Sequence, residues 1–135
     1  MAGKISIAFS IIILLLSLIA CVRDCTYSYF VKNTSTGIIK LKVEAYGDDG
    51  FVSELFTIPA NSEQLIFVDE GWYSESASNP PDTMREFTLF EVVKNDSVPT
   101  VSNFKLGNKW SYLVTSTKSD SRAAKYTAEV TDNDF

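Results

Sequence analysis

The sequence predicts an all-β protein, a β-sandwich of seven or eight short antiparallel strands that follows a cleaved N-terminal signal helix. Three observations lead to this prediction. After Cys21, no window of the sequence shows the apolar period of a helix. Runs of alternating apolar and polar residues are instead separated by clusters of Gly, Asn, Asp, Ser and Pro. Aromatic residues make up 13% of the chain, a composition that suits a β core.

The segment 38–46 shows the clearest alternation in the chain. Its apolar side chains are expected to point to one face and its charged side chains to the other, namely Ile39, Leu41, Val43 and Ala45 against Lys40, Lys42 and Glu44. This pattern predicts a strand with one buried and one solvated face. Gly47-Asp48-Asp49-Gly50 predicts a tight turn, after which residues 51–58 return as the hairpin partner.

The same reasoning predicts the other strands, which are residues 26–32, 64–68, 85–93, 98–106, 110–117 and 125–131. In segment 85–93, Phe87 and Leu89 are expected on one face and Phe90 and Val92 on the other, so both faces would be buried. Gly107-Asn108 predicts a hairpin turn. Together the strands favour an immunoglobulin-like sandwich, although the cysteine pair of antibody domains is absent.

Residues 69–83 are predicted to form one long loop between two strands. Trp72 and Tyr73 lie in it, outside any clean alternation. Two interpretations remain open for these aromatic side chains. They cap the open end of the sandwich, or they form a contact surface for a glycan, a small ligand or a protein.

The first 20 residues have the composition of a bacterial secretory signal. Lys4 gives a positively charged start, and residues 5–16 are apolar except for two serines. Leu18-Ile19-Ala20-Cys21 then resembles the lipobox of bacterial lipoproteins. The resemblance implies that a diacylglycerol is attached to the Cys21 sulfur, that the chain is cut before Cys21, and that the new N-terminus is acylated, palmitate being a typical fatty acid. It therefore implies a signal peptide at 1–20, a lipidated N-terminus and short tether at 21–25, and one domain at 26–135.

An uncleaved transmembrane anchor is the alternative, because residues 5–22 are just long enough to span a bilayer. In either case the domain would face the side opposite the cytoplasm. Val22 is not the Asp that resembles an inner-membrane retention signal, and no acidic cluster resembling a surface-export signal follows Cys21. We therefore expect a lipid-anchored protein of the outer membrane that faces the periplasm. Residues 126–135 also resemble the last strand of small uncharacterised β-sandwich lipoproteins of Bacteroides-type bacteria, a likeness that implies no activity.

Charge and cysteine content exclude some classes of function. A net charge of −5 disfavours binding to nucleic acid, which needs basic patches. If Cys21 carries a lipid, Cys25 is the only free thiol and cannot pair within the chain. We expect Cys25 to be a small buried side chain at the start of the first strand.

The chain has no histidine, which removes the Ser-His-Asp and Cys-His nucleophile pairs and the usual imidazole metal ligands. Carboxylate pairs such as Asp69-Glu70 keep a small hydrolase open as an alternative, but a domain of this size rarely builds the cleft it needs. Asp48-Asp49 and Asp132-Asn133-Asp134 lack the ligand spacing of calcium loops, so a turn and a solvated tail are the favoured interpretations. We expect no catalytic residue, metal or cofactor.

Two tripeptides, Asp82-Thr83-Met84 and Asp96-Ser97-Val98, resemble the O-glycosylation acceptor of Bacteroides-type bacteria. Both fall in predicted turns, where a glycan can be accommodated, so Thr83 and Ser97 are candidate acceptors.

The sequence as a whole favours a binding or structural module of the bacterial envelope. We expect this module to interact with the membrane through its lipid and to have an envelope protein or a glycan as its candidate partner.

Overall fold

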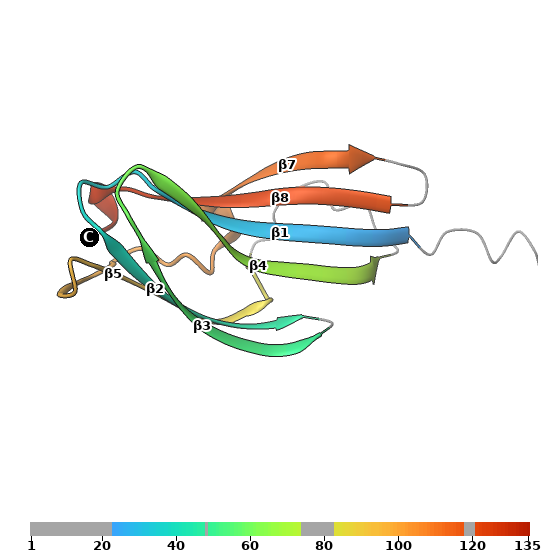
Figure 1. Ribbon diagram of the computed structural model, residues 1–135, viewed down its shortest axis with the longest axis horizontal. Coiled ribbons are helices and arrows are strands. Elements are labelled where there is room, and N and C mark those ends of the chain that lie inside the picture. The colour runs from blue at the N-terminus through green and yellow to red at the C-terminus, as the bar shows by residue number, and fades with distance from the viewer. Residues whose placement is uncertain (1–22, 48, 74–82, 118–120) are drawn as a thin grey trace, which may run out of the picture.

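The computed structural model describes residues 23–47, 49–73, 83–117 and 121–135, and these form two four-stranded sheets that pack face to face (Figure 1). The β-sandwich predicted from the sequence is confirmed. Its strands are β1 (Arg23–Asn33), β2 (Ile39–Gly47), β3 (Gly50–Ile58), β4 (Ser62–Tyr73), β5 (Phe87–Lys94), β6 (Val98–Pro99), β7 (Trp110–Thr117) and β8 (Ser121–Val130). Two single-turn 3-10 helices, η1 (Gly107–Lys109) and η2 (Asp132–Asp134), complete the described structure.

One sheet has the strand order β4-β1-β8-β7 and the other has β3-β2-β5-β6. All neighbouring strands are antiparallel except β1 and β8, which run parallel. The expectation of a wholly antiparallel sandwich is therefore wrong for this central pair. An alternating pattern specifies which face of a strand is buried, but it carries no information on which strand lies beside it or in which direction.

The core lies between the sheets and is formed mainly by β1, β2 and β8. The alternation predicted for β2 is confirmed, since Ile39, Leu41, Val43 and Ala45 are all at most 2% exposed. The core also contains buried residues of β1 and β8, namely Tyr27, Tyr29 and Val31 and Tyr126, Ala128 and Val130. Figure 1 shows these strands running along the length of the sandwich.

The predicted facing of residues in β5 is wrong because the strand contains a bulge. Glu44 pairs with Leu89 and Ala45 with Phe87, so Thr88 is the extra residue opposite β2. A bulge shifts the alternation by one residue. Phe87 and Phe90 consequently lie together against Trp110, with ring centroids 5.5 and 5.7 Å from the indole.

The strand predicted at 98–106 is reduced to the two residues of β6, and Gly107-Asn108 begins η1 rather than a hairpin. Pro99 cannot donate to a ladder, which limits pairing along this edge. The rest of the segment is held by single backbone hydrogen bonds, such as the one from the Val101 N–H to the Asp134 carbonyl oxygen, and by side chains. Phe104 is 1% exposed, and the Trp110 indole Nε1 donates a hydrogen bond of 2.7 Å to its carbonyl oxygen.

The two ends of the sandwich differ in what they contain. We call the end formed by the start of β1, the end of β4 and the tip of the β2–β3 hairpin the N-terminal end (Figure 1). The opposite end carries the chain after β1, the turn between β3 and β4, and η2. There the backbone N–H of Thr34 donates to Val130 and that of Asn61 to Asn33, so the turns are tied to the strands.

Candidate functional site

The predicted lipid-bearing residue, Cys21, lies outside the described residues. β1 begins at Arg23, two residues later, and Arg23, Asp24 and Cys25 already pair with β4. Residues 23–25, the last three of the tether predicted at 21–25, therefore belong to the sheet. Cys25 is 3% exposed, which confirms the interpretation of this side chain as a small buried group.

Trp72 and Tyr73 are not in a loop, as the sequence predicted, but are the last two residues of β4. The polar run Asp69-Glu70-Gly71 looked like a loop, yet its backbone pairs with β1 through residues 25–27. Trp72 is opposite Asp24 and Tyr73 is opposite Arg23. Both aromatic residues therefore occur at the N-terminal end, beside the start of the described chain, and the rest of the predicted loop, residues 74–82, lies outside the described residues.

The tip of the β2–β3 hairpin carries two exposed aromatic side chains that the sequence analysis did not single out. Tyr46 is 60% exposed and Phe51 is 52% exposed, and they are cross-strand partners with ring centroids 5.0 Å apart. We call this pair the aromatic tip. Tyr46 lies on the face of β2 that otherwise carries Lys40, Lys42 and Glu44, and an aromatic residue on this charged face was the signal that could have identified it.

The hairpin tip is held close to the other sheet. A Cβ built on Gly47 would lie 2.8 Å from the Phe67 ring and 3.0 Å from an Asp69 carboxylate oxygen, so a larger residue there would have to displace the Phe67 ring. Gly50 has φ 106°, a conformation that favours glycine in a hairpin turn. The backbone next to Tyr46 is therefore packed against β4.

Four tyrosines gather in the interior on β1, β7 and β8. Tyr29 and Tyr126 stack, Tyr27 is 6.1 Å from Tyr126, and Tyr112 is 5.1 Å from Tyr126, measured between ring centroids. Burial raises the pKa of the Tyr27, Tyr29 and Tyr112 hydroxyls above the ordinary value, so these groups stay neutral at physiological pH. The cluster is suited to packing and hydrogen bonding rather than to proton transfer.

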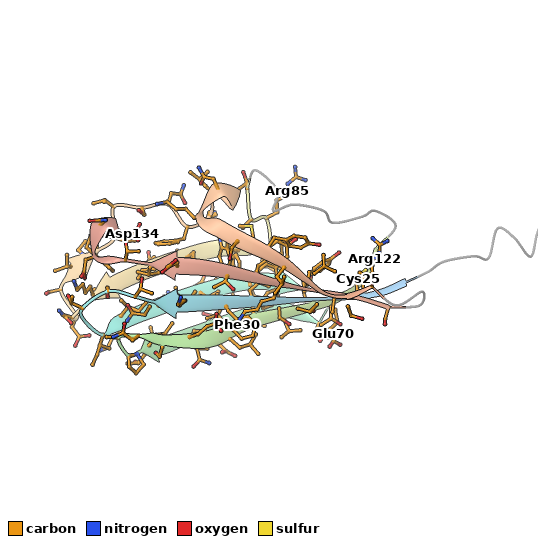
Figure 2. All side chains as sticks on the ribbon, turned by 90° about the horizontal axis from the view of Figure 1, so that it is seen from above. Cys25, Phe30, Glu70, Arg85, Arg122 and Asp134 are labelled. Atoms are coloured by element: carbon orange, nitrogen blue, oxygen red, sulfur yellow. The ribbon has the colours of Figure 1, made fainter. Side chains whose placement is uncertain are left out.

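Cys25 of β1 and Arg122 of β8 are register partners at the N-terminal end. Figure 2 shows the two residues near each other. The charge of Arg122 lowers the pKa of Tyr112, which opposes the larger effect of burial. Glu86 forms a side-chain hydrogen bond with Tyr29, while its buried Oε2 atom has no partner. These polar groups come from β1, β7, β8 and the turn before β5, and they do not form a nucleophile with a base beside it.

The carboxylate pair Asp69-Glu70 does not form a facing dyad. Asp69 is opposite the buried Tyr27, whereas Glu70 is opposite Thr26 and is exposed. Successive residues of a strand point to opposite faces of the sheet, so the two carboxylates are separated by the sheet itself. A glycosidase-type mechanism needs two carboxylates that flank one bond, and this pair cannot supply them.

Residues 132–134 are not the solvated tail that the sequence favoured. They form η2, in which Thr131 and Asp134 make a capping box. Asp134 is 6% exposed and accepts hydrogen bonds from the Ser102 hydroxyl at 2.5 Å and the Thr131 backbone N–H at 2.8 Å. Asp132 is paired with Lys94 and accepts from the Thr36 backbone N–H.

These contacts occupy the carboxylates that the sequence had considered as calcium ligands. Of the other pair, Asp48 lies outside the described residues and Asp49 is exposed. Within the described ranges, no three Cys, Asp or Glu side chains are grouped closely enough to hold a metal ion.

The two candidate glycosylation residues are both exposed. Thr83 forms an isolated bridge with Leu106, and Ser97 lies in the turn between β5 and β6, where Asn95 and Asp96 have φ of 48° and 62°. Both side chains are accessible for modification. The structure does not bring them together, since they precede and follow β5.

Comparison of this chain with family models, with curated proteins and with solved structures finds no match. None of the helices in the described ranges has the length and apolar content that crossing a bilayer requires. Inferences about function therefore rest on the fold and on the exposed residues.

Proposed function

We propose that this protein is a lipid-anchored β-sandwich of the bacterial envelope that acts as a binding or structural module, with Cys21 as the lipidated residue. The observation that carries the proposal is the start of β1 at Arg23, directly after the lipobox. A chain whose first ordered strand begins two residues after an acylated cysteine holds its domain against the membrane. Two or more acyl chains give stable anchoring where one does not.

We place the protein in the outer membrane, facing the periplasm. Val22 after the lipobox cysteine and the absence of an acidic cluster in the following residues support this placement. An envelope protein is the partner class that such a module fits best, since the acidic chain disfavours nucleic acid.

A glycan or small-ligand binder acting through residues 69–83 is the second candidate. The exposed aromatic tip and the aromatic pair Trp72-Tyr73 are the observations that favour it, because stacking on aromatic rings is a common mode of recognition. A small carboxylate-dependent hydrolase is the third candidate. The separation of Asp69 and Glu70 by the sheet removes the carboxylate pair that had motivated it.

Metabolic labelling with palmitate tests the anchor, and Cys25 supplies a matched control. The wild type and Cys25→Ala should both incorporate label and fractionate with membranes, because Cys25 is buried in β1. Cys21→Ala should incorporate none and should remain uncleaved or become soluble. Label that survives in Cys21→Ala would contradict the proposal, and an unlabelled membrane-bound wild type would favour the transmembrane anchor.

A further inference from the structure

We propose that the aromatic tip, Tyr46 and Phe51, is a contact site for the phospholipid surface, toward which the domain leans. The proposal rests on the proposed lipid anchor at Cys21 and adds an orientation to it. The occupant is the membrane from which the domain emerges, rather than a soluble partner.

The first argument is the exposure of two adjacent aromatic rings. Tyr46 and Phe51 are 60% and 52% exposed, and both project from the outer face of the β2–β3 hairpin. Leu55 continues this face along β3 at 69% exposure. Tyr carries an apolar ring with a polar tip, which suits the headgroup region of a bilayer.

The second argument is the position of this pair relative to the candidate lipid. The aromatic tip and the start of β1 lie at the same end of the sandwich (Figure 1). Trp72 and Tyr73 are register partners of Asp24 and Arg23 and so belong to this end as well. Aromatic residues therefore occur at two places on the end that faces the anchor.

The third argument is geometric and gives the direction of lean. Gly47, next to Tyr46, abuts Asp69, whose register partner in β1 is Tyr27. Tyr27 is four residues from Arg23, so the tip is set back by about 13 Å along the strand. An upright domain would hold the tip away from the lipid, whereas tilting toward the β3-β2-β5-β6 sheet brings its outer face down onto the surface.

Charge near the tip offers no attraction to anionic lipid, because Asp49 in the hairpin turn is exposed. Lys42 lies on the same outer face and is paired with Glu44 at 3.3 Å. Apolar and aromatic contact, rather than attraction of cations to anionic lipid, therefore has to provide the interaction. The short connection to Cys21 limits how far the domain can move from the surface, which raises the effective concentration of the tip at the membrane.

Fluorescence quenching by lipid tests the orientation in the full-length lipidated protein. Two variants are made in a Trp72→Phe background, Phe51→Trp at the tip and Val101→Trp as a control. Val101 is 81% exposed, and its backbone N–H bonds to Asp134 at the opposite end. Each protein is reconstituted in phosphatidylcholine vesicles, with or without bromine on the acyl chains.

Bromination should quench about half of the Phe51→Trp emission, because Trp110 is the only other indole and is buried in the core. It should leave Val101→Trp unchanged. Equal emission of Phe51→Trp with and without bromine overturns the proposal. This holds even if the indole at position 51 is shielded from the soluble quencher acrylamide, because a protein rather than lipid then covers the tip. Quenching of both variants overturns the direction of lean.

Palmitate labelling of the same variants separates this inference from the proposed function. If the protein is labelled but the indole at the tip is not quenched, the proposed anchor stands and the proposed membrane contact is wrong. If the protein is not labelled, the proposed anchor is wrong, and so is the contact that depends on it.

Discussion

Tyr29 of β1 and Tyr126 of β8 stack with their ring centroids 5.0 Å apart and their planes 9° from parallel. The two residues are register partners in the parallel pair that joins the first and last strands. Tyr29 also meets Phe87 and Trp110 edge-on at 5.2 and 5.9 Å, so one side chain links both sheets. This contact is the centre of the core.

We predict that Tyr126→Ala lowers the free energy of unfolding by about 3–5 kcal/mol, as for other buried aromatic side chains. Tyr46→Ala is the matched control and should change it by less than about 0.5 kcal/mol, because Tyr46 is exposed. Urea denaturation of both variants measures the difference. In a double-mutant cycle, Tyr29 and Tyr126 should couple by about 0.5–1.5 kcal/mol. Equal effects of Tyr126→Ala and Tyr46→Ala would contradict the proposed core.

Asn33 is fully buried, and its side chain ties the end of β1 to its surroundings. Its amide nitrogen donates to the carbonyl oxygens of Gly37 and Ile58, both at 2.9 Å, and its oxygen accepts from the Ser35 backbone and hydroxyl. Asn33→Ala should cost about 2–4 kcal/mol, since it leaves several buried groups unpaired.

Asn33→Asp should also destabilise the protein, because a carboxylate cannot donate to two carbonyl oxygens. Asn103→Ala is the control, since Asn103 is exposed and holds only the Lys105 backbone N–H. Thermal melting of the three variants is the measurement. A stable Asn33→Asp would show that the carbonyl contacts contribute little.

Asp134 should make stability depend on pH. Burial raises the pKa of its carboxyl, but hydrogen bonds from Ser102 and Thr131 and the Lys109 ammonium outweigh this effect, so the pKa lies below its ordinary value. A lowered pKa means that the unfolded chain binds the proton more tightly. The stabilisation is therefore present above about pH 4 and is lost as the pH falls through the folded-state value.

Asp134→Asn should consequently cost about 1–3 kcal/mol at neutral pH, and its difference from the wild type should shrink in acid. Asp132→Asn provides the comparison, with a smaller effect, because Asp132 is exposed. Denaturation at a series of pH values checks both. A cost that stays constant from neutral to acidic pH would mean that the charge of Asp134 is irrelevant.

Cys25 should be unreactive in the folded protein and should form no disulfide. The melting temperature should be the same with and without reductant, and iodoacetamide should modify Cys25 far faster in urea than in buffer. A fall in melting temperature on adding reductant would indicate a disulfide. If the partner were Cys21, that cysteine would not carry a lipid.

In a host with Bacteroides-type O-glycosylation, Thr83 and Ser97 should carry glycan, because both are exposed. The intact mass should exceed that of the lipidated chain, and the double variant Thr83→Ala with Ser97→Ala should remove the excess. Thr57→Ala, an exposed strand residue outside the motif, should not. An unmodified wild-type mass in such a host would rule out both acceptors.

Local patterns in the sequence predict most strands, but they do not predict how the strands are combined. Each residue of β2 could be assigned to a face from the sequence, because one face of the strand is buried in the core and the other is exposed to solvent. β4 was predicted too short, since Asp69-Glu70-Gly71 is polar and its pairing with β1 is a long-range event. The bulge at Thr88 and the buried irregular segment around Phe104 depend on packing that no local period reveals.

The candidate site was predictable only in part, for the same reason. Composition and motif pointed to Cys21 and to the aromatic residues Trp72 and Tyr73, which prove to end β4. The pairing of Trp72 with Asp24 places those aromatic residues at the N-terminal end, and only the three-dimensional structure provides that relationship. The aromatic tip was missed because a single exposed aromatic residue on each strand of a hairpin does not disturb the apolar period.

The parallel pairing of β1 with β8 determines when this chain can fold. The first strand acquires its second neighbour only after almost the whole polypeptide has been synthesised, because Tyr29 and Tyr126 are separated by about 100 residues. Until then one edge of β1 stays open for pairing with other chains. The domain should therefore fold slowly, and chains that lose their last strand through truncation or proteolysis should aggregate rather than persist as smaller folded units.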